Sequence, residues 1–133
     1  MKKTDLGYLL LTFILLFLTV LTIDFAEAAP IIKYYGNVDQ KECNATIKNI
    51  PDVYYTKLKA IKVFERQNYA REGAYWPGQI ELYHGCNKYI LIHELAHHQQ
   101  YLHKEKWYYI LTHKGNFTRY EGLIEEANIH ASP

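Results

Sequence analysis

Three short segments of the chain have the composition and spacing of β-strands. Residues 31–35 are apolar and aromatic before Gly36-Asn37 interrupts them, so they are predicted to form a strand or an ordered N-terminal arm. Residues 60–65 are rich in β-branched and aromatic side chains, which suit a pleated, half-buried surface. Residues 79–83 alternate polar and apolar side chains, as a strand with one buried face does. A short β-sheet is therefore expected.

Longer segments repeat apolar side chains with the 3.6-residue period of an α-helix. A helix is predicted from about residue 87 to about residue 104, because no Gly or Pro interrupts this stretch and its leucines share one face. A second amphipathic helix is predicted over 117–131, after the turn signal at 114–116. Residues 107–112 suit a short helix or a return segment, and Pro51-Asp52 resembles a helix start.

Two stretches are predicted to be loops. They are residues 42–50 and the polar, Gly- and Pro-containing residues 66–78. Because the strand at 79–83 comes immediately before the helix at 87–104, we expect this strand to be the edge of the sheet. An extended peptide could add to such an edge through main-chain hydrogen bonds.

The order of these elements is helix, strand, strand, helix, helix, which predicts an α+β fold. In this fold a short β-sheet packs on the helix at 87–104 and on a second, C-terminal helix. The length of 133 residues suits one domain. The formal net charge of +1 and the absence of a basic patch give no indication of a nucleic-acid partner.

Residues 1–28 have the features of a targeting segment. Lys2 and Lys3 precede an almost wholly apolar run, and Ala26-Glu27-Ala28 is a small-x-small cleavage site. A cleaved signal peptide is the preferred interpretation, and an uncleaved membrane anchor is the alternative, because the run is nearly long enough to span a bilayer. In both cases residues 29–133 form the exported domain, and a membrane is a partner only if the segment stays uncleaved.

Export explains how the two cysteines are used. Cys43 and Cys86 are the only pair, and an oxidising compartment favours a disulfide between them. A metal-ligand role for them does not fit, because they form no Cys-x-x-Cys pair. We therefore expect a secreted or extracytoplasmic protein closed by one disulfide.

The candidate chemistry lies in the sequence His93-Glu94-Leu95-Ala96-His97, within the predicted helix at 87–104. Residues four apart lie on the same helix face, so the two imidazoles can share one Zn²⁺. Glu94, about 100° around the helix, can contact a water on the metal without being a ligand. The alternative is a helix with incidental surface histidines, but burying unpaired polar groups is costly.

Zinc catalysis needs a third protein ligand. His103 has the spacing found in metzincins, which require Gly at the position of Gln100 so that the chain turns back. On an unbroken helix His103 would lie about 15 Å from His93. His103 is therefore disfavoured.

His113 is the first choice. His113-Lys114-Gly115-Asn116-Phe117 before a helix resembles the SprT-like zincins, in which HExxH is followed by a His-Gly-x-x-aromatic turn. His113 and Phe117 match that pattern, whereas Lys114 departs from the usual Gly. The resemblance implies a zincin-like fold over about residues 59–131.

Glu121 is the alternative third ligand. The stretch from Glu121 to Glu125 resembles the ligand helix of gluzincins, which implies that Glu121 binds the metal and that Glu125 is an outer-sphere residue steadying an imidazole. A solvated acidic helix face is the simpler interpretation. The choice between His113 and Glu121 stays open at this stage.

The zincin resemblance implies a small secreted zinc metallopeptidase that acts on a peptide or protein substrate, with Glu94 as general base. A tyrosine, His98 or His130 could assist the oxyanion, and the sequence does not select among them. The alternative is a non-catalytic or latent zinc-binding module. Its metal site would be closed by a fourth side chain, or its cavity would be covered by residues 29–35 or 129–133.

Overall fold

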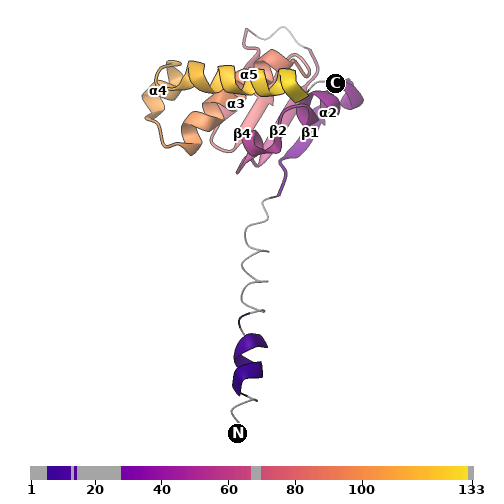
Figure 1. The fold of residues 1–133 in the computed structure, drawn as a ribbon. Coiled ribbons are helices and arrows are strands. Elements are labelled where there is room, and N and C mark those ends of the chain that lie inside the picture. Colours follow the sequence, from indigo (N-terminus) through magenta and orange to yellow (C-terminus); the bar gives the residue numbers. More distant parts are fainter. Residues whose placement is uncertain (1–5, 13, 15–27, 67–69, 132–133) are drawn as a thin grey trace.

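A four-stranded sheet forms the centre of the domain in the computed structural model, which describes residues 6–12, 14, 28–66 and 70–131 (Figure 1). The strand order is β1-β2-β4-β3. Strands β1 (Ile31–Tyr35), β2 (Ala60–Phe64) and β4 (Gln79–Leu82) run parallel, whereas β3 (Gly73–Trp76) is antiparallel to β4. The prediction of a strand at 31–35 is confirmed.

The remaining elements are helical. They are α2 (Gln40–Lys48), the 3-10 helix η1 (Asp52–Tyr55), α3 (Lys88–Leu102), α4 (Trp107–Leu111) and α5 (Phe117–Ala131). Helices α3 and α5 pack side by side, and α3 also contacts β3 and β4 (Figure 1). The structure thus confirms an α+β fold with a sheet, a central helix and a C-terminal helix.

The core lies between the sheet and α3. Alternate residues of β2 and β4 are fully buried, as are two leucines of α3 and one isoleucine of α5: Ile61, Val63, Ile80, Leu82, Leu91, Leu95 and Ile124. Burying one such side chain stabilises a fold by roughly 1.5–3 kcal/mol. Helix α3 is therefore held by the sheet on one side and by α5 on another, which gives its histidines a rigid support.

The start of α3 is fixed by two local features. The side chain of Asn87 accepts hydrogen bonds from the backbone N–H groups of Tyr89 and Ile90, as an N-cap residue does. Cys86, one residue earlier, is joined to Cys43 of α2 by a disulfide, so the predicted pairing is confirmed. This bond ties the beginning of α3 to the N-terminal part of the domain.

The prediction of a loop at 42–50 is wrong, because most of that stretch belongs to α2. Asp39 caps this helix by accepting a hydrogen bond from the Glu42 N–H at 3.1 Å. Cys43 and Ile47, one turn apart, are its buried residues. With so few apolar positions the segment shows a helical pattern only weakly.

The predicted loop at 66–78 contains strand β3, and this changes which strand lies at the edge. Pro77 and Gly78, the latter with a φ of +81°, make the tight turn between β3 and β4. Strand β4 therefore lies between β2 and β3. The prediction that residues 79–83 form the edge is wrong, and β3 is the edge strand on this side.

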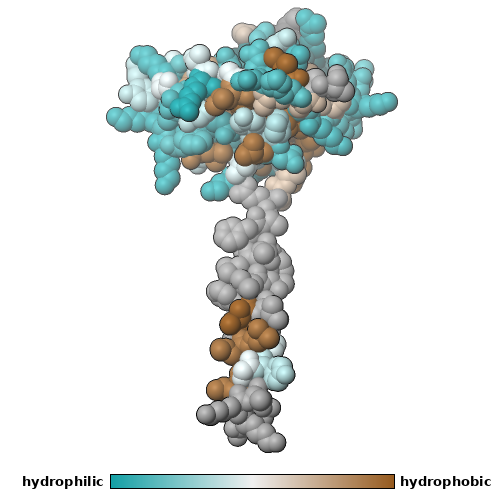
Figure 2. Space-filling view, viewed as in Figure 1, coloured by the Kyte–Doolittle hydropathy of each residue, from teal (hydrophilic) through white to brown (hydrophobic). Residues whose placement is uncertain are grey.

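The N-terminal segment is described only in part. Residues 6–12 are helical, and Leu6, Leu9, Leu10 and Leu11 are exposed, in contrast to the mostly hydrophilic face of the domain in Figure 2. Within the described ranges no helix has the length and hydrophobicity needed to span a bilayer. The predicted signal peptide at 1–28 lies largely outside the described residues and stays a prediction.

Candidate metal centre

His93 and His97 lie one turn apart on α3, with their ring centroids 5.0 Å apart. His97 is only 8% exposed, and His93 is partly buried. The continuous helix between Lys88 and Leu102 fixes this spacing, because no residue in it breaks the i to i+4 geometry. The two imidazoles thus project together from one helix face, as the motif predicts.

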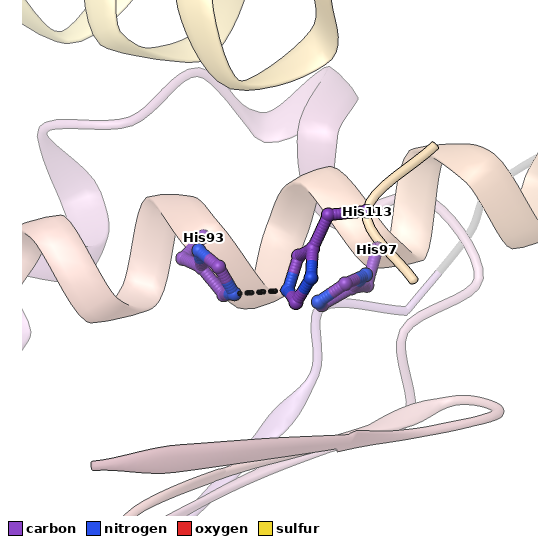
Figure 3. A group of neighbouring side chains, drawn as sticks. All are labelled: His93, His97 and His113. Atoms are coloured by element: carbon purple, nitrogen blue, oxygen red, sulfur yellow. Dashed lines mark hydrogen bonds between the residues drawn. The ribbon is translucent and has the colours of Figure 1, made fainter. Parts of the chain in front are cut away.

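His113 joins them from the loop between α4 and α5. Its Nε2 lies 3.0 Å from His93 Nε2, and its ring centroid lies 4.8 Å from that of His97. Each of the three histidines offers one nitrogen, and these nitrogens all lie within 4.8 Å of one another. Figure 3 shows the three rings converging, with His113 approaching from its own loop. This group of three is close enough to hold a metal ion.

The backbone at His113 is unusual for a residue with a side chain. Its φ of +56° lies in the left-handed region, which is uncommon outside glycine. Gly115, with a φ of +62°, continues the turn, so the chain reverses between α4 and α5. This reversal brings the His113 ring back towards α3.

Phe117 packs against all three imidazoles. Its ring centroid lies 4.9 Å from that of His93 and 4.8 Å from those of His97 and His113. It is the first residue of α5 and only 5% exposed. The sequence identified Phe117 as part of a motif, but its role as an apolar support for the rings appears only in the structure.

The electrostatics of the cluster favour neutral imidazoles. Burial, together with the smaller effects of the neighbouring His93 and His113, lowers the pKa of His97 to about 4. Burial and His113 also lower the pKa of His93, against the opposite effect of Glu121. A neutral imidazole is the form that binds a metal, so the donor set fits a zinc ion.

Glu94 lies beside this group on α3 and is 6% exposed. Burial raises the pKa of its carboxyl group to about 7, although the positive charge of Arg71 opposes the shift. A carboxyl group with a pKa near 7 can both accept and release a proton at neutral pH. The effect of Arg71 on the pKa of Glu94 could not be predicted from the sequence, because Arg71 lies in a predicted loop.

A cavity of about 770 Å³ opens in front of the histidines. Glu94, the three histidines and the whole of β3 line it, together with apolar residues of α4 such as Trp107 and Leu111. Neither residues 29–35 nor 129–131 are part of its wall. The described ends of the domain therefore leave the cavity uncovered.

Glu121 and Glu125 do not lie where the gluzincin resemblance implies. Glu121 lies on the far side of His93, with its carboxylate 3.2 Å from Nδ1 of that ring. It is thus outside the group of converging nitrogens, and it contacts an imidazole as the gluzincin resemblance implies for Glu125. Glu125 is exposed, and it lines the cavity without any hydrogen bond to the three histidines among the described residues.

The other histidines have separate surroundings. His103 stacks on Tyr120 and bonds to the Gln99 carbonyl through Nδ1 at 2.7 Å, so it lies outside the cluster, as expected. His98 is fully buried between the Tyr75 hydroxyl at 2.9 Å and the Thr56 carbonyl at 2.7 Å. His130 is exposed, 3.9 Å from Glu126. His98 therefore holds β3 and η1 against α3 through these hydrogen bonds.

Comparisons with protein families, curated proteins and solved structures found no match to this chain.

Proposed function

We propose that this chain is a small secreted zinc metallopeptidase of the zincin class. The observation that carries the proposal is the convergence of His93, His97 and His113 beside the buried carboxyl group of Glu94. Two of these histidines and the glutamate belong to the HExxH pattern, and the third comes from the turn that resembles SprT-like proteins. Three protein ligands with one open position are the arrangement of catalytic zinc sites.

The three imidazoles would hold the ion. A bound Zn²⁺ supplies Lewis acidity, which lowers the pKa of a coordinated water towards about 7 and polarises a carbonyl group. Glu121 would keep His93 in one tautomer by accepting a hydrogen bond from its Nδ1–H, so that Nε2 faces the ion. His113 completes the set in place of the alternative ligand Glu121.

Glu94 would move the proton. It would accept one from the attacking water and then pass it to the amine that leaves when the peptide bond breaks. Its raised pKa of about 7 matches it to both roles near neutral pH. Burial within the cavity wall limits the access of bulk water to this carboxyl group.

The substrate would be a peptide in extended conformation. Strand β3 lines the cavity and has no strand on its outer side among the described residues, so its free backbone groups can pair with a peptide. This placement puts the peptide backbone next to His93, Glu94 and His97. The peptide would therefore pair with β3, and not with β4 at residues 79–82.

Export is the second part of the proposal. The disulfide between Cys43 and Cys86 suits an oxidising compartment, and the apolar N-terminal run with its Ala-Glu-Ala site suits a signal peptide. The substrate would accordingly be met outside the cytoplasm.

The test is hydrolysis of unfolded casein by zinc-loaded protein and by two variants. Glu94→Gln should abolish cleavage, whereas Glu125→Gln, on the cavity wall, should retain most of it. Casein cleavage that survives Glu94→Gln would contradict the assigned mechanism. A hydroxamate that competes with substrate would show an open coordination position, and failure of any hydroxamate to bind zinc-loaded protein would favour the closed, non-catalytic alternative.

A further inference from the structure

Gln100 is a buried polar residue three positions after His97, on the same face of α3. Its side chain is 0% exposed. Its Nε2 donates a hydrogen bond of 2.7 Å to the carbonyl oxygen of Lys114, the residue after His113. One end of this amide therefore holds the loop that carries the third histidine.

The other end of the amide faces His97. Gln100 Oε1 and His97 Nδ1 are both buried, and neither has a hydrogen-bond partner among the described residues. Burial, His93 and His113 lower the pKa of His97, whereas hydrogen bonding to the Gln100 side chain acts in the opposite direction. One of these atoms is an acceptor and the other can carry a proton, and their residues lie one helical turn apart on the same face of α3.

Among the hydrogen bonds that hold the loop beyond His113, two form a chain that leads back to Gln100. The Asn116 N–H donates to Glu105 Oε1 at 2.9 Å, and the Glu105 N–H donates to the Gln100 carbonyl oxygen at 3.0 Å. A side chain at Gly115 would collide with the Glu105 carboxylate unless that carboxylate moved. The left-handed backbone of His113 is therefore held in place by a tight turn anchored on Gln100 and Glu105.

We propose that Gln100 is a positioning residue of the metal centre, which orients His97 with its amide oxygen and fixes the backbone beside His113 with its amide nitrogen. One side chain thereby sets the distance between two of the three ligands. The inference rests on the proposed function, because it concerns the same metal centre.

Gln99 offers a matched control. It is also buried, at 7% exposed, and its Nε2 donates to the Tyr54 carbonyl oxygen at 3.0 Å, away from the histidines. Gln99→Leu and Gln100→Leu each remove one amide that bonds to a backbone carbonyl. The two substitutions should therefore have similar costs in thermal stability, and only the second should affect the metal centre.

The measurement is Co²⁺ affinity of the full exported domain, followed by visible absorbance in competition with a chelator. Gln100→Leu should weaken binding roughly 10- to 100-fold, the usual effect of losing an outer-sphere partner, and Gln99→Leu should leave it close to wild type. In the metal-free proteins, amide hydrogen exchange at 113–116 should be faster in Gln100→Leu than in Gln99→Leu. Equal Co²⁺ affinity and equal exchange in the two variants would overturn the inference.

A second variant keeps the test decisive if Gln100→Leu does not fold. Gln100→Glu retains an acceptor for His97 but cannot donate to the Lys114 carbonyl, so it should also accelerate exchange at 113–116 and weaken Co²⁺ binding. Wild-type affinity in Gln100→Glu would overturn the role at His113. Wild-type protein that binds no Co²⁺ at all would overturn the proposed function as well, so the two failures are distinguishable.

Discussion

The carboxylate of Glu121 lies 3.2 Å from Nδ1 of His93, on the side of the ring away from the nitrogen that faces His113. A carboxylate in this position accepts a hydrogen bond from Nδ1–H, and this tautomer leaves the Nε2 lone pair directed at the histidine cluster. Helix α5 packs against α3 and brings this carboxylate to His93.

Replacing Glu121 should weaken zinc binding without unfolding the domain. Glu121→Ala leaves His93 free to rotate, so we expect a loss of roughly 10- to 100-fold in zinc affinity. The matched variant is Glu125→Ala, one turn along the same helix and exposed, which should bind zinc as wild type does. Competition with a chelating indicator measures both, and equal affinities in the two variants would rule out an outer-sphere role for Glu121.

Strand β3 comes close to two side chains of α3 at Gly73. A methyl group there would lie 2.7 Å from Ile90 Cγ2, 3.0 Å from Glu94 Oε1 and 3.1 Å from the Glu81 carbonyl oxygen. Gly73→Ala should cost roughly 1–3 kcal/mol in unfolding free energy, as overpacking does. Because Glu94 must shift, casein cleavage should fall more than zinc affinity does.

The control for this substitution is Gly122→Ala in α5, where nothing lies within 4 Å of the added carbon. Alanine favours a helix over glycine by roughly 0.5–1 kcal/mol, so this variant should be more stable than wild type and equally active. Denaturant unfolding and casein cleavage measure both effects. A Gly73→Ala variant as active as Gly122→Ala would show that β3 does not constrain Glu94.

The elements with a clear period or a strand-like composition could be predicted from the sequence, whereas α2 and β3 could not. Helix α3 and strand β4 have clear periods of 3.6 and 2, so their places were predicted closely. Strand β3 has four residues, begins with Gly73 and ends just before Pro77, so its composition does not favour a strand. Its antiparallel pairing with β4 stabilises it as one. A tertiary pairing of this kind leaves little local trace in sequence.

The same distinction applies to the site. His93 and His97 share one helix, so their spacing alone predicts their proximity. His113 and Glu121 lie on different elements, and their distances from α3 depend on the reversal at His113 and on helix packing. The sequence therefore left both open as third ligand, whereas the structure brings only His113 into the cluster.

The buried carboxyl group of Glu94 should make the stability of the metal-free protein depend on pH. Burial raises its folded-state pKa from 4.5 to about 7, so the folded protein keeps a proton that the unfolded chain releases between these values. The resulting stabilisation is complete below pH 4.5 and is lost as pH rises through 7. Each pH unit in this window changes the contribution by up to about 1.4 kcal/mol.

Comparison of Glu94→Gln with wild type isolates the effect of Glu94. The buried histidines, whose pKa values are lowered, change stability with pH in the opposite direction, but they are present in both proteins. The unfolding free energy of Glu94→Gln minus that of wild type should increase between pH 4.5 and pH 7. Urea unfolding in the presence of a chelator measures it. Parallel pH dependences of the two proteins would show that Glu94 has an ordinary pKa.

The disulfide should contribute strongly to the stability of so small a domain. Cys43 and Cys86 close a loop with a sequence separation of 43, and the chain-entropy model gives a stabilisation of about 4 kcal/mol for a loop of this size. The double substitution Cys43→Ser with Cys86→Ser should lower the unfolding free energy by about that amount. Wild-type protein should also lose stability in reductant, whereas the double variant should not respond.

The most direct test of the account is a crystal structure of zinc-loaded protein with anomalous diffraction recorded on both sides of the zinc absorption edge. We expect a single zinc peak per chain, with nitrogens of His93, His97 and His113 at about 2.0–2.1 Å, and a water or inhibitor in the fourth position. A peak bound by Glu121 in place of His113, or no peak among these histidines, would contradict the account.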